Sequence, residues 1–370
     1  MTSILTNHSA MSALQTLRSV GSTLTDMQEQ VSSGLRVKSA ADNAAYWSIS
    51  TSMKSDAKAL SAVSDAIGTT NAILDTTYAG LDAIHQELDT IKSLMVTAAS
   101  MPTPDISYFY NAYDNWREMD PAYAQSEQAK VALDVDQHMQ QIRSILRGSS
   151  FAGTNLLYMG DNSPVEARNV TNTFVTGYAN GRALTVDLPL TDTLLVNDSY
   201  MDAATFSNSD PGNGGLLDPS MSLTVEGSDG ITHSTGIAMF TNWSITWQGA
   251  ETEPLASSND MIRKVEFYTQ KYGADRQDAW NQVIQQWDER LGKITALMGK
   301  IGSIQQDMQR TDTSVMQQRT SIDEGVSRLI DADMEEASAK LAAQQTQQQL
   351  AVQSLQIANQ APQNIMQLFQ

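Results

Sequence analysis

The sequence predicts a mainly α-helical, elongated protein in which helical arms from both chain ends carry a small β-rich insert formed by the middle. Three observations lead to this fold class. Apolar residues recur at coiled-coil spacing near both ends, short alternating runs occur in the middle, and the middle holds most of the net negative charge. Two arms that leave and return to the same place put both termini at one end of the molecule.

The first predicted element is a helix over residues 3–35. Its apolar seam advances in steps of four and three residues, as in a coiled coil, and consists of Ala10, Leu14, Leu17, Gly21, Leu24, Gln28, Val31 and Leu35. Gly21 and Gln28 weaken an isolated pair because small and polar seam residues reduce its stability. Neighbouring copies are therefore expected to complete the core.

Further helices are predicted over residues 44–100 and 124–147, and over residues 258–299 with a break near Gly273, because apolar residues keep helical spacing there. These helices form the arms that lead to and from the insert.

The middle of the chain has a different composition. Between Asp161 and Asp260 there are 13 acidic residues against two basic ones, which contributes −11 to the net charge of −19. Alternating runs over residues 172–178, 183–188 and 221–226 are typical of strands separated by turns. This segment is predicted to be the small β-rich module.

The C-terminal end carries the second seam. It consists of Ile301, Ile304, Met308, Thr311, Val315, Gln318, Ile322, Gly325 and Leu329, and after a break Leu341, Gln345, Gln348, Val352 and Leu355. This coil can run antiparallel along the N-terminal one. The last 30 residues have no charged side chain and 11 Gln, which indicates either burial by surrounding protein or a disordered low-complexity tail. Both hold if the tail folds only on assembly.

Composition excludes several function classes. A net charge of −19 argues against nucleic-acid binding because no basic cluster is available to neutralise phosphates. No apolar stretch approaches the roughly 20 residues that cross a membrane, and the first 30 residues have no secretory signal pattern. Zero cysteines exclude disulfides and thiolate metal sites. Composition alone predicts a soluble cytoplasmic protein.

The sequence indicates no catalytic, cofactor-binding or metal site. The four histidines lie far apart and no phosphate-binding or dinucleotide motif occurs. Asp331, Asp333, Glu335 and Glu336 lie within six helical positions, so they cannot all face one ion. A salt-linked face towards a neighbouring subunit is the preferred interpretation, with bases such as Arg36, Lys38 or Arg328.

Several longer motifs occur in a fixed order near both ends. They are Ile4–Leu14, Gln30–Val37 followed by Ser39–Ala45, the corner Phe151–Leu157, and the stretch from Ile322 through Asp331–Glu336 to Leu350–Asn359. These motifs resemble bacterial flagellin, and the chain is similar to the rhizobial, alphaproteobacterial type. The resemblance covers residues 1–160 and 285–370. It leaves the middle of the chain unmatched.

The resemblance implies three layers. Residues 1–45 plus 328–370 form an inner coiled-coil layer, in which the polymerisation seam consists of Leu14, Leu17, Leu24, Val31, Leu35, Leu329, Leu341, Val352 and Leu355. Residues 46–160 plus 285–327 form an outer helical layer with a β-hairpin. Residues 161–284 form a variable surface-exposed domain. Gly34 lies at the layer junction, and Phe151 and Gly153 lie at the helix-to-hairpin turn.

The resemblance also implies a function. The chain is expected to be the subunit that polymerises into the flagellar filament for swimming, secreted through the flagellar type III export apparatus. Its implied partners are further copies, sibling flagellins, the cap and junction proteins, and an export chaperone. The alternatives are a hook–filament junction protein and, without the resemblance, a cytoplasmic coiled-coil binding protein.

The sequence departs from the family pattern in two informative places. Receptor-stimulating flagellins have Gln-Arg where this chain has Asp89 and Thr90, between Leu88 and Leu94, which implies weak or no stimulation of the vertebrate flagellin receptor. Residues 101–123 form an aromatic insertion between two outer-layer helices. It is expected either to pack on the insert domain or to contact another subunit.

Overall fold

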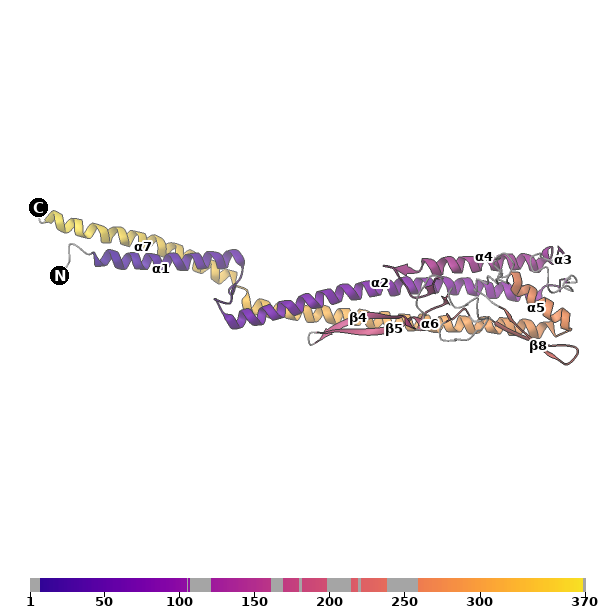
Figure 1. Ribbon diagram of the computed structural model, residues 1–370. Coiled ribbons are helices and arrows are strands. Elements are labelled where there is room, and N and C mark those ends of the chain that lie inside the picture. The colour runs from indigo at the N-terminus through magenta and orange to yellow at the C-terminus, as the bar shows by residue number, and fades with distance from the viewer. Residues whose placement is uncertain are drawn as a thin grey trace, which may run out of the picture. The chain divides into compact units, whose positions relative to one another are not determined.

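The fold is mainly α-helical, with short strands contributed by the middle of the chain (Figure 1). The computed structural model describes residues 7–104, 106, 121–160, 169–179, 182–197, 214–218, 221–237 and 259–368. The chain divides into two compact units, one from Met1–Ala62 and Val315–Gln370 and the other from Val63–Ser314. The predicted fold class of helices from both chain ends around a β-containing middle is confirmed.

The first unit is built around a pair of terminal helices. Helix α1 (His8–Ser33) packs along α7 (Met334–Leu368), and Figure 1 shows the two side by side. The Asn7 side-chain amide donates to the carbonyl of Ala358 at 2.8 Å, whereas the amide of Ala332 donates to the carbonyl of Gly34 at 2.9 Å. The two helices are therefore antiparallel, as predicted.

The second unit is a helical bundle. It contains most of α2 (Ala44–Ser100) and α6 (Arg276–Ile330), together with α3 (Pro121–Ala124), α4 (Glu127–Gly148) and α5 (Asn259–Tyr272). Its fully buried side chains follow helical spacing and include Leu74, Leu81, Ile84, Leu88 and Ile91 of α2, Val135, Ile142 and Leu146 of α4, and Trp287, Ile294 and Ile301 of α6. The core forms because each helix buries one apolar stripe.

The described strands form two-stranded sheets in the second unit. They are β1 (Ser150–Phe151) with β2 (Thr154–Asn155), β3 (Tyr158–Met159) with β6 (Val196–Asn197), β4 (Thr171–Ala179) with β5 (Arg182–Pro189), and β7 (Met221–Glu226) with β8 (Thr232–Ile237). The β3–β6 pair is parallel and the others are antiparallel. The three runs predicted as strands are β4, β5 and β7.

A tight turn joins β1 and β2 directly after α4. Ala152 has a φ of 49° and Gly153 a φ of 81°. Positive φ at both central residues is the geometry of a type I′ hairpin turn, which glycine adopts at little cost. The side-chain amide of Asn155 donates to the carbonyl of Leu146 at 2.7 Å, so the turn is fixed against the end of α4.

Helix α5 joins the bundle through a buried polar network. The fully buried Glu266 carboxylate accepts from Arg276 at 2.6 Å, from the Trp280 indole at 3.0 Å and from Gln128 at 2.9 Å. Arg276 also donates to the carbonyls of Ala99 and Met101, at 2.8 and 3.0 Å. Because the last carbonyls of a helix have no partner within it, Arg276 acts as the cap of α2.

The aromatic insertion lies partly within the described residues. Pro104, Ile106 and residues from 121 onwards are described, whereas residues 105 and 107–120 are not. Ile106 and Tyr123 are buried together with Phe267 of α5, and the Gln270 side chain donates to the carbonyl of Pro104 at 2.9 Å. The described ends of the insertion therefore pack against α5.

We expect Glu266→Ala to destabilise the second unit by about 3 kcal/mol. Removing one partner of a buried pair leaves the other charge uncompensated, which costs roughly 3–5 kcal/mol. The lower end applies because Arg276 keeps its carbonyl partners and a 27% exposed side chain. Denaturant unfolding followed by tryptophan fluorescence measures the change.

The matched control is Asp307→Ala, which removes an exposed ion pair with Arg310 from the same unit. Exposed pairs contribute about 0–1 kcal/mol, so its unfolding midpoint should stay close to that of the unsubstituted protein. Equal effects of the two substitutions would contradict a structural role for the Glu266 network.

Candidate assembly surface

The terminal helices pair through stripes of small and medium side chains. The stripes are buried or half-buried and advance by three and four residues: Ala10, Ala13, Leu17, Val20, Leu24, Met27 and Val31 on α1, and Ala337, Leu341, Gln344, Gln348, Ala351, Leu355 and Ala358 on α7. This spacing is that of a coiled-coil seam. Alanines at five of these positions allow the two helices to lie close together.

The observed seam differs from the predicted one at every second position. Leu17, Leu24, Val31, Leu341 and Leu355 lie in it. Leu14 and Val352, in contrast, are 39% and 40% exposed, and their neighbours Ala13 and Ala351 face the partner helix instead. A seam through Ala13 and Ala351 and a seam through Leu14 and Val352 both have the three-four spacing of a coiled coil. Which of the two forms therefore depends on how α1 and α7 pair. In these two pairs of neighbours the larger side chain is left exposed.

The connection from α1 to α2 is hydrogen-bonded to the connection from α6 to α7. Gly34 ends α1 with a left-handed φ of 72°, and its amide donates to the carbonyl of Gln30 at 2.9 Å. Leu35 forms an isolated bridge with Asp331, and the Ile330 carbonyl accepts from Arg36 and Val37. Four chain segments therefore meet at one point, which we call the junction (residues 34–37 and 329–332).

An apolar cluster stabilises the junction. Val37, Val326 and Ile330 are buried there, and the partly buried Leu35 and Leu329 pack against them. These two leucines, predicted as part of the polymerisation seam, thus lie within one copy of the chain. Their contacts position the start of α2 against the end of α6.

Charged side chains at the junction are bonded within the chain. Arg36 donates to the carbonyl of Leu329 at 3.1 Å, and Lys38 forms an ion pair with Glu29. The Asp333 carboxylate caps α7 by accepting the amide of Glu335 at 3.0 Å. The predicted salt-linked face towards a neighbour stays a prediction, because no contact between copies is part of this structure. Among the described residues, no group of acidic or histidine side chains is arranged to hold a metal ion.

Asp42 organises the loop between α1 and α2. Its carboxylate accepts the backbone amides of Ser39 and Lys38 at 2.9 and 3.0 Å, and these bonds hold its pKa below the ordinary value. The effect of the Ser39 amide is the largest. Asn43 then caps α2 by accepting the amide of Tyr46 at 3.0 Å. The loop is thus fixed by short polar side chains at its end.

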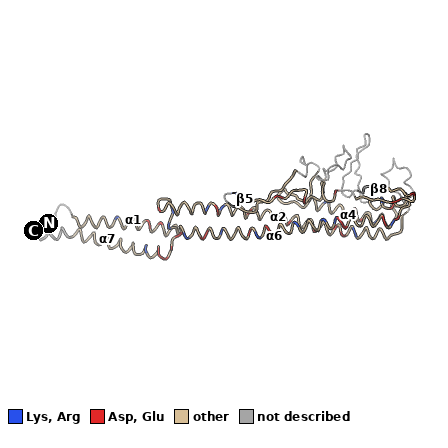
Figure 2. The backbone as a smooth tube through the Cα atoms, turned by 90° about the horizontal axis from the view of Figure 1, so that it is seen from below, with Lys and Arg blue, Asp and Glu red and all other residues tan. Residues whose placement is uncertain are grey.

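The outer faces of the paired helices expose large apolar side chains. Met11 is 63% exposed, Leu350 58% and Ile357 69%, in addition to Leu14 and Val352. We call these five residues the assembly surface. Figure 2 shows that α7 has no charged residue beyond its first turns, the last one being Lys340. A solvated helix normally presents charge on such a face, so this surface is suited to burial against protein.

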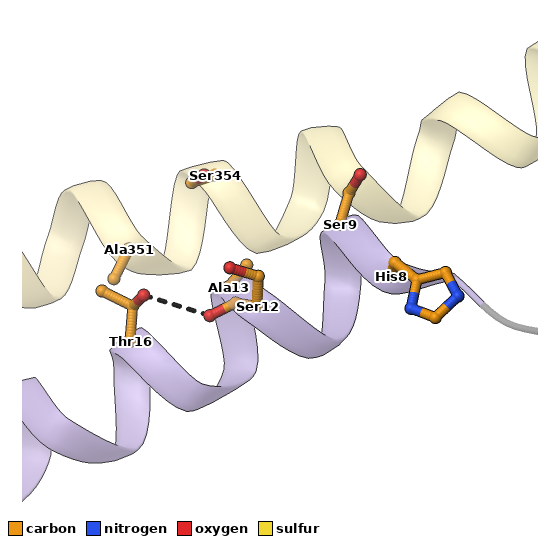
Figure 3. Close-up of a pocket in the computed structure, with 7 residues that line it drawn as sticks. All are labelled: His8, Ser9, Ser12, Ala13, Thr16, Ala351 and Ser354. Carbon is orange, nitrogen blue, oxygen red and sulfur yellow. Dashed lines mark hydrogen bonds between the residues drawn. The ribbon is translucent and has the colours of Figure 1, made fainter. Parts of the chain in front are cut away.

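An open groove of about 520 Å³ runs beside the seam near the start of α1. Figure 3 shows His8, Ser9, Ser12, Ala13 and Thr16 of α1 opposite Ala351 and Ser354 of α7. The Thr16 hydroxyl donates to the carbonyl of Ser12 at 3.0 Å. The described residues that line the groove include no carboxylate, Lys or Arg, so this lining offers mainly small side chains and hydroxyl groups.

The remaining predicted site residues lie in the second unit. Leu88 is fully buried in α2, Asp89 and Thr90 are exposed on the same helix, and Leu94 is half-buried. Phe151 is 41% exposed beside the type I′ turn that contains Gly153.

Sequence reasoning missed three kinds of residue in the first unit. Asn7 caps α1 by accepting the amide of Ala10 at 3.0 Å and also bonds α7. An Asn directly before an apolar periodic run was a signal that could have identified it. Ala13 and Ala351 had no signal that distinguishes them from their larger neighbours. The Trp47 side chain near the start of α2 is 40% exposed, and nothing in the local sequence pattern predicted an exposed tryptophan there.

Comparison with known proteins places the chain in a family. It matches the bacterial flagellin N-terminal helical region over residues 4–107 and the C-terminal helical region over residues 284–369. Flagellin C of Rhizobium meliloti strain 1021 is 34% identical and flagellin B of Rhizobium meliloti 32%, each with both chains fully covered. A Brucella melitensis flagellin is 32% identical, covering 100% of this chain and 99% of that one.

A solved structure of FliC from Burkholderia pseudomallei is also similar, at 16% identity over 64% of this chain and 99% of that one. Its TM-score of 0.28 is too low to relate the details of the two folds.

Paired terminal helices that expose large apolar side chains are typical of a structural subunit that associates with further copies. The chain belongs to the bacterial flagellin family, in its alphaproteobacterial branch. It is therefore a filament-forming structural protein and not an enzyme. No helix among the described residues has the length and apolar character needed to span a membrane.

We expect Gly34→Ala and Gly21→Ala to change stability in opposite directions. A Cβ at either position meets no atom within 4 Å, so only backbone conformation differs between them. Alanine at the left-handed φ of Gly34 costs about 1–2 kcal/mol. Alanine within α1 at Gly21 stabilises by roughly 0.5–1 kcal/mol. Amide exchange of α1 measures both effects, and a stabilising Gly34→Ala would refute the role of the turn.

We expect the loop at Asp42 to lose order in acid. A depressed folded-state pKa contributes stability that is present above the unfolded value, about 3.9, and is lost as pH falls through the folded value. Protection of the Lys38 and Ser39 amides should therefore be constant from neutral pH to about pH 4 and then fall. In Asp42→Asn this pH dependence should disappear. Unchanged protection at low pH in the native sequence would contradict the prediction.

Proposed function

We propose that the assembly surface forms the contacts between copies in the innermost layer of the flagellar filament. The observation that carries this proposal is the exposure of five large apolar side chains on a pair of helices, of which α7 has no charged residue after Lys340. Fully burying one such side chain contributes about 1.5–3 kcal/mol, and a filament repeats the contact at every subunit. Burial of this kind supplies a driving force that needs no ion pairs and is therefore not weakened when salt screens charges.

The predicted layers form the next part of the proposal. Residues 1–45 plus 328–370 are assigned to the inner layer, residues 46–160 plus 285–327 to the surrounding helical layer, and residues 161–284 to the outer surface. The junction supports this division because Gly34 and Ile330 mark the points where both chain segments change direction together. The seam residues Leu17, Leu24, Val31, Leu341 and Leu355 support the inner pair.

Location and further partners follow from family membership. The chain is proposed to be secreted through the flagellar type III export apparatus with an export chaperone, and to polymerise outside the cell. There it contacts the cap and junction proteins, with or without sibling flagellins. No observation favours the hook–filament junction protein as an alternative, because the matched relatives are named flagellins.

The test places charge on the assembly surface. Met11→Asp combined with Ile357→Asp should raise the critical concentration for filament growth at least about tenfold, since each buried carboxylate costs more than 1.4 kcal/mol. Both side chains are more than 60% exposed, so the monomer should keep its helical content. Electron microscopy and sedimentation after seeding measure growth.

The matched control is Met11→Leu with Ile357→Leu, which keeps both positions apolar and similar in volume. It should form filaments at close to the native concentration. Normal filaments from the aspartate variant would exclude this face as a contact between subunits.

A further inference from the structure

Two glutamine side chains of α6 bond the backbone of β7. The Gln286 amide accepts from the Ser222 amide at 2.9 Å and donates to the Ser222 carbonyl at 2.8 Å. The Gln282 amide accepts from the Thr224 amide at 3.2 Å and donates to the Thr224 carbonyl at 2.8 Å. Each glutamine therefore satisfies both backbone groups of one residue. We call this pair the glutamine cover.

The repeat of the helix matches the repeat of the strand. Residues four apart on a helix are separated by about 6 Å, and residues two apart on a strand by about 6.6–6.8 Å. Ser222 and Thr224 share one edge, since alternate residues of an antiparallel strand point their backbone groups to the same side. Two primary amides at this spacing therefore reproduce the hydrogen bonds of a neighbouring strand.

The other sides of β7 have different partners. On the opposite edge it pairs with β8, from Met221 with Ile237 to Glu226 with Thr232. Its side chains Met221, Leu223 and Val225 are buried at 0%, 0% and 3% exposure. Among the described residues, the edge that faces α6 is paired with no strand. Without the glutamines, it would present free amides and carbonyls to other chains.

We propose that Gln282 and Gln286 determine the specificity of self-association by closing the β7 edge against the β7 edge of a second copy. This inference rests on the proposed function, because a protein that assembles through its terminal helices brings many copies together. An open strand edge would offer those copies a competing contact. The glutamine cover removes that contact while leaving the terminal helices free to associate.

The end of the cover is also defined. Asp278 lies one turn before Gln282 on the same face of α6, and its carboxylate accepts from the Gln282 amide at 2.9 Å. This bond orients the Gln282 side chain towards Thr224. A carboxylate cannot donate to a carbonyl, so the cover ends there.

The test compares Gln282→Ala plus Gln286→Ala with Asn281→Ala plus Gln285→Ala. The control positions are exposed on the same helix with the same spacing. Both are made with Glu226→Cys, an exposed position at the end of β7 that gives a single thiol, because the native sequence has no cysteine. Met11→Asp and Ile357→Asp are included to suppress filament growth. A flexible bismaleimide then reports contact between β7 edges.

Removal of the cover should give two results. Exchange of the Ser222 and Thr224 amides in dilute monomer should become about tenfold faster or more, and cross-linked dimers should form several-fold more than in the control. Unchanged amide exchange, or faster exchange with control levels of dimer, would overturn the proposal. Protection of the buried α2 amides establishes in each sample that the bundle is folded.

A third variant separates edge closure from simple loosening of the hairpin. Gln282→Glu plus Gln286→Glu removes the donors to the β7 carbonyls but adds two negative charges, which oppose strand pairing between copies. Its carboxylates still accept the Ser222 and Thr224 amides but no longer donate to the carbonyls. These amides should therefore exchange more slowly than in the alanine variant, without additional cross-linked dimer. Dimer formation equal to that of the alanine variant would contradict edge closure. Failure of the proposed function gives a different result, because filaments would then still grow in the variants that carry Met11→Asp and Ile357→Asp.

Discussion

The structure of the first unit depends on the pairing of the chain's two ends. Helix α1 has no other long partner within this unit among the described residues, and its seam is composed largely of alanine and medium apolar side chains. Pairing through small residues has two effects. It brings the helix backbones close together, and it leaves the larger Leu14, Leu350 and Val352 on the outside. Under the proposed function, stability within one copy and association between copies thereby depend on different side chains.

Polar side chains elsewhere replace missing backbone partners. Arg276 satisfies carbonyls at the end of α2, the glutamine cover satisfies the edge of β7, and the buried Asp218 accepts the amides of Gly215 and Asn197 at 2.6 and 2.7 Å. Unpaired buried backbone groups are costly, so each irregular segment needs such a partner. Single polar side chains therefore fix the ends and edges of the elements in and around the bundle.

The sequence predicted the elements well but not which face of a helix meets which partner. Helical periodicity located α2, α4 and α6, since it records burial directly. Alternation located β4, β5 and β7, although β5 is mostly exposed and only β7 alternates buried with exposed side chains along its length. The choice between Ala13 and Leu14 depends on the partner helix, which periodicity does not contain. Glu266 and Gln282 occupy helical positions typical of solvated residues. Their roles depend on segments distant in sequence, so the local pattern has no information about them.

The bond between Asn7 and Ala358 joins residues 351 positions apart. Closing so long a loop costs only about 0.6 kcal/mol more free energy than closing a loop of half the length. Closure is nevertheless slow, because contacts between residues distant in sequence form slowly. A chain synthesised from its N-terminus cannot pair α1 with α7 until residues 334–368 have been made. Chains that end before α7 therefore lack the paired helices, so under the proposed function they also lack the surface through which copies associate.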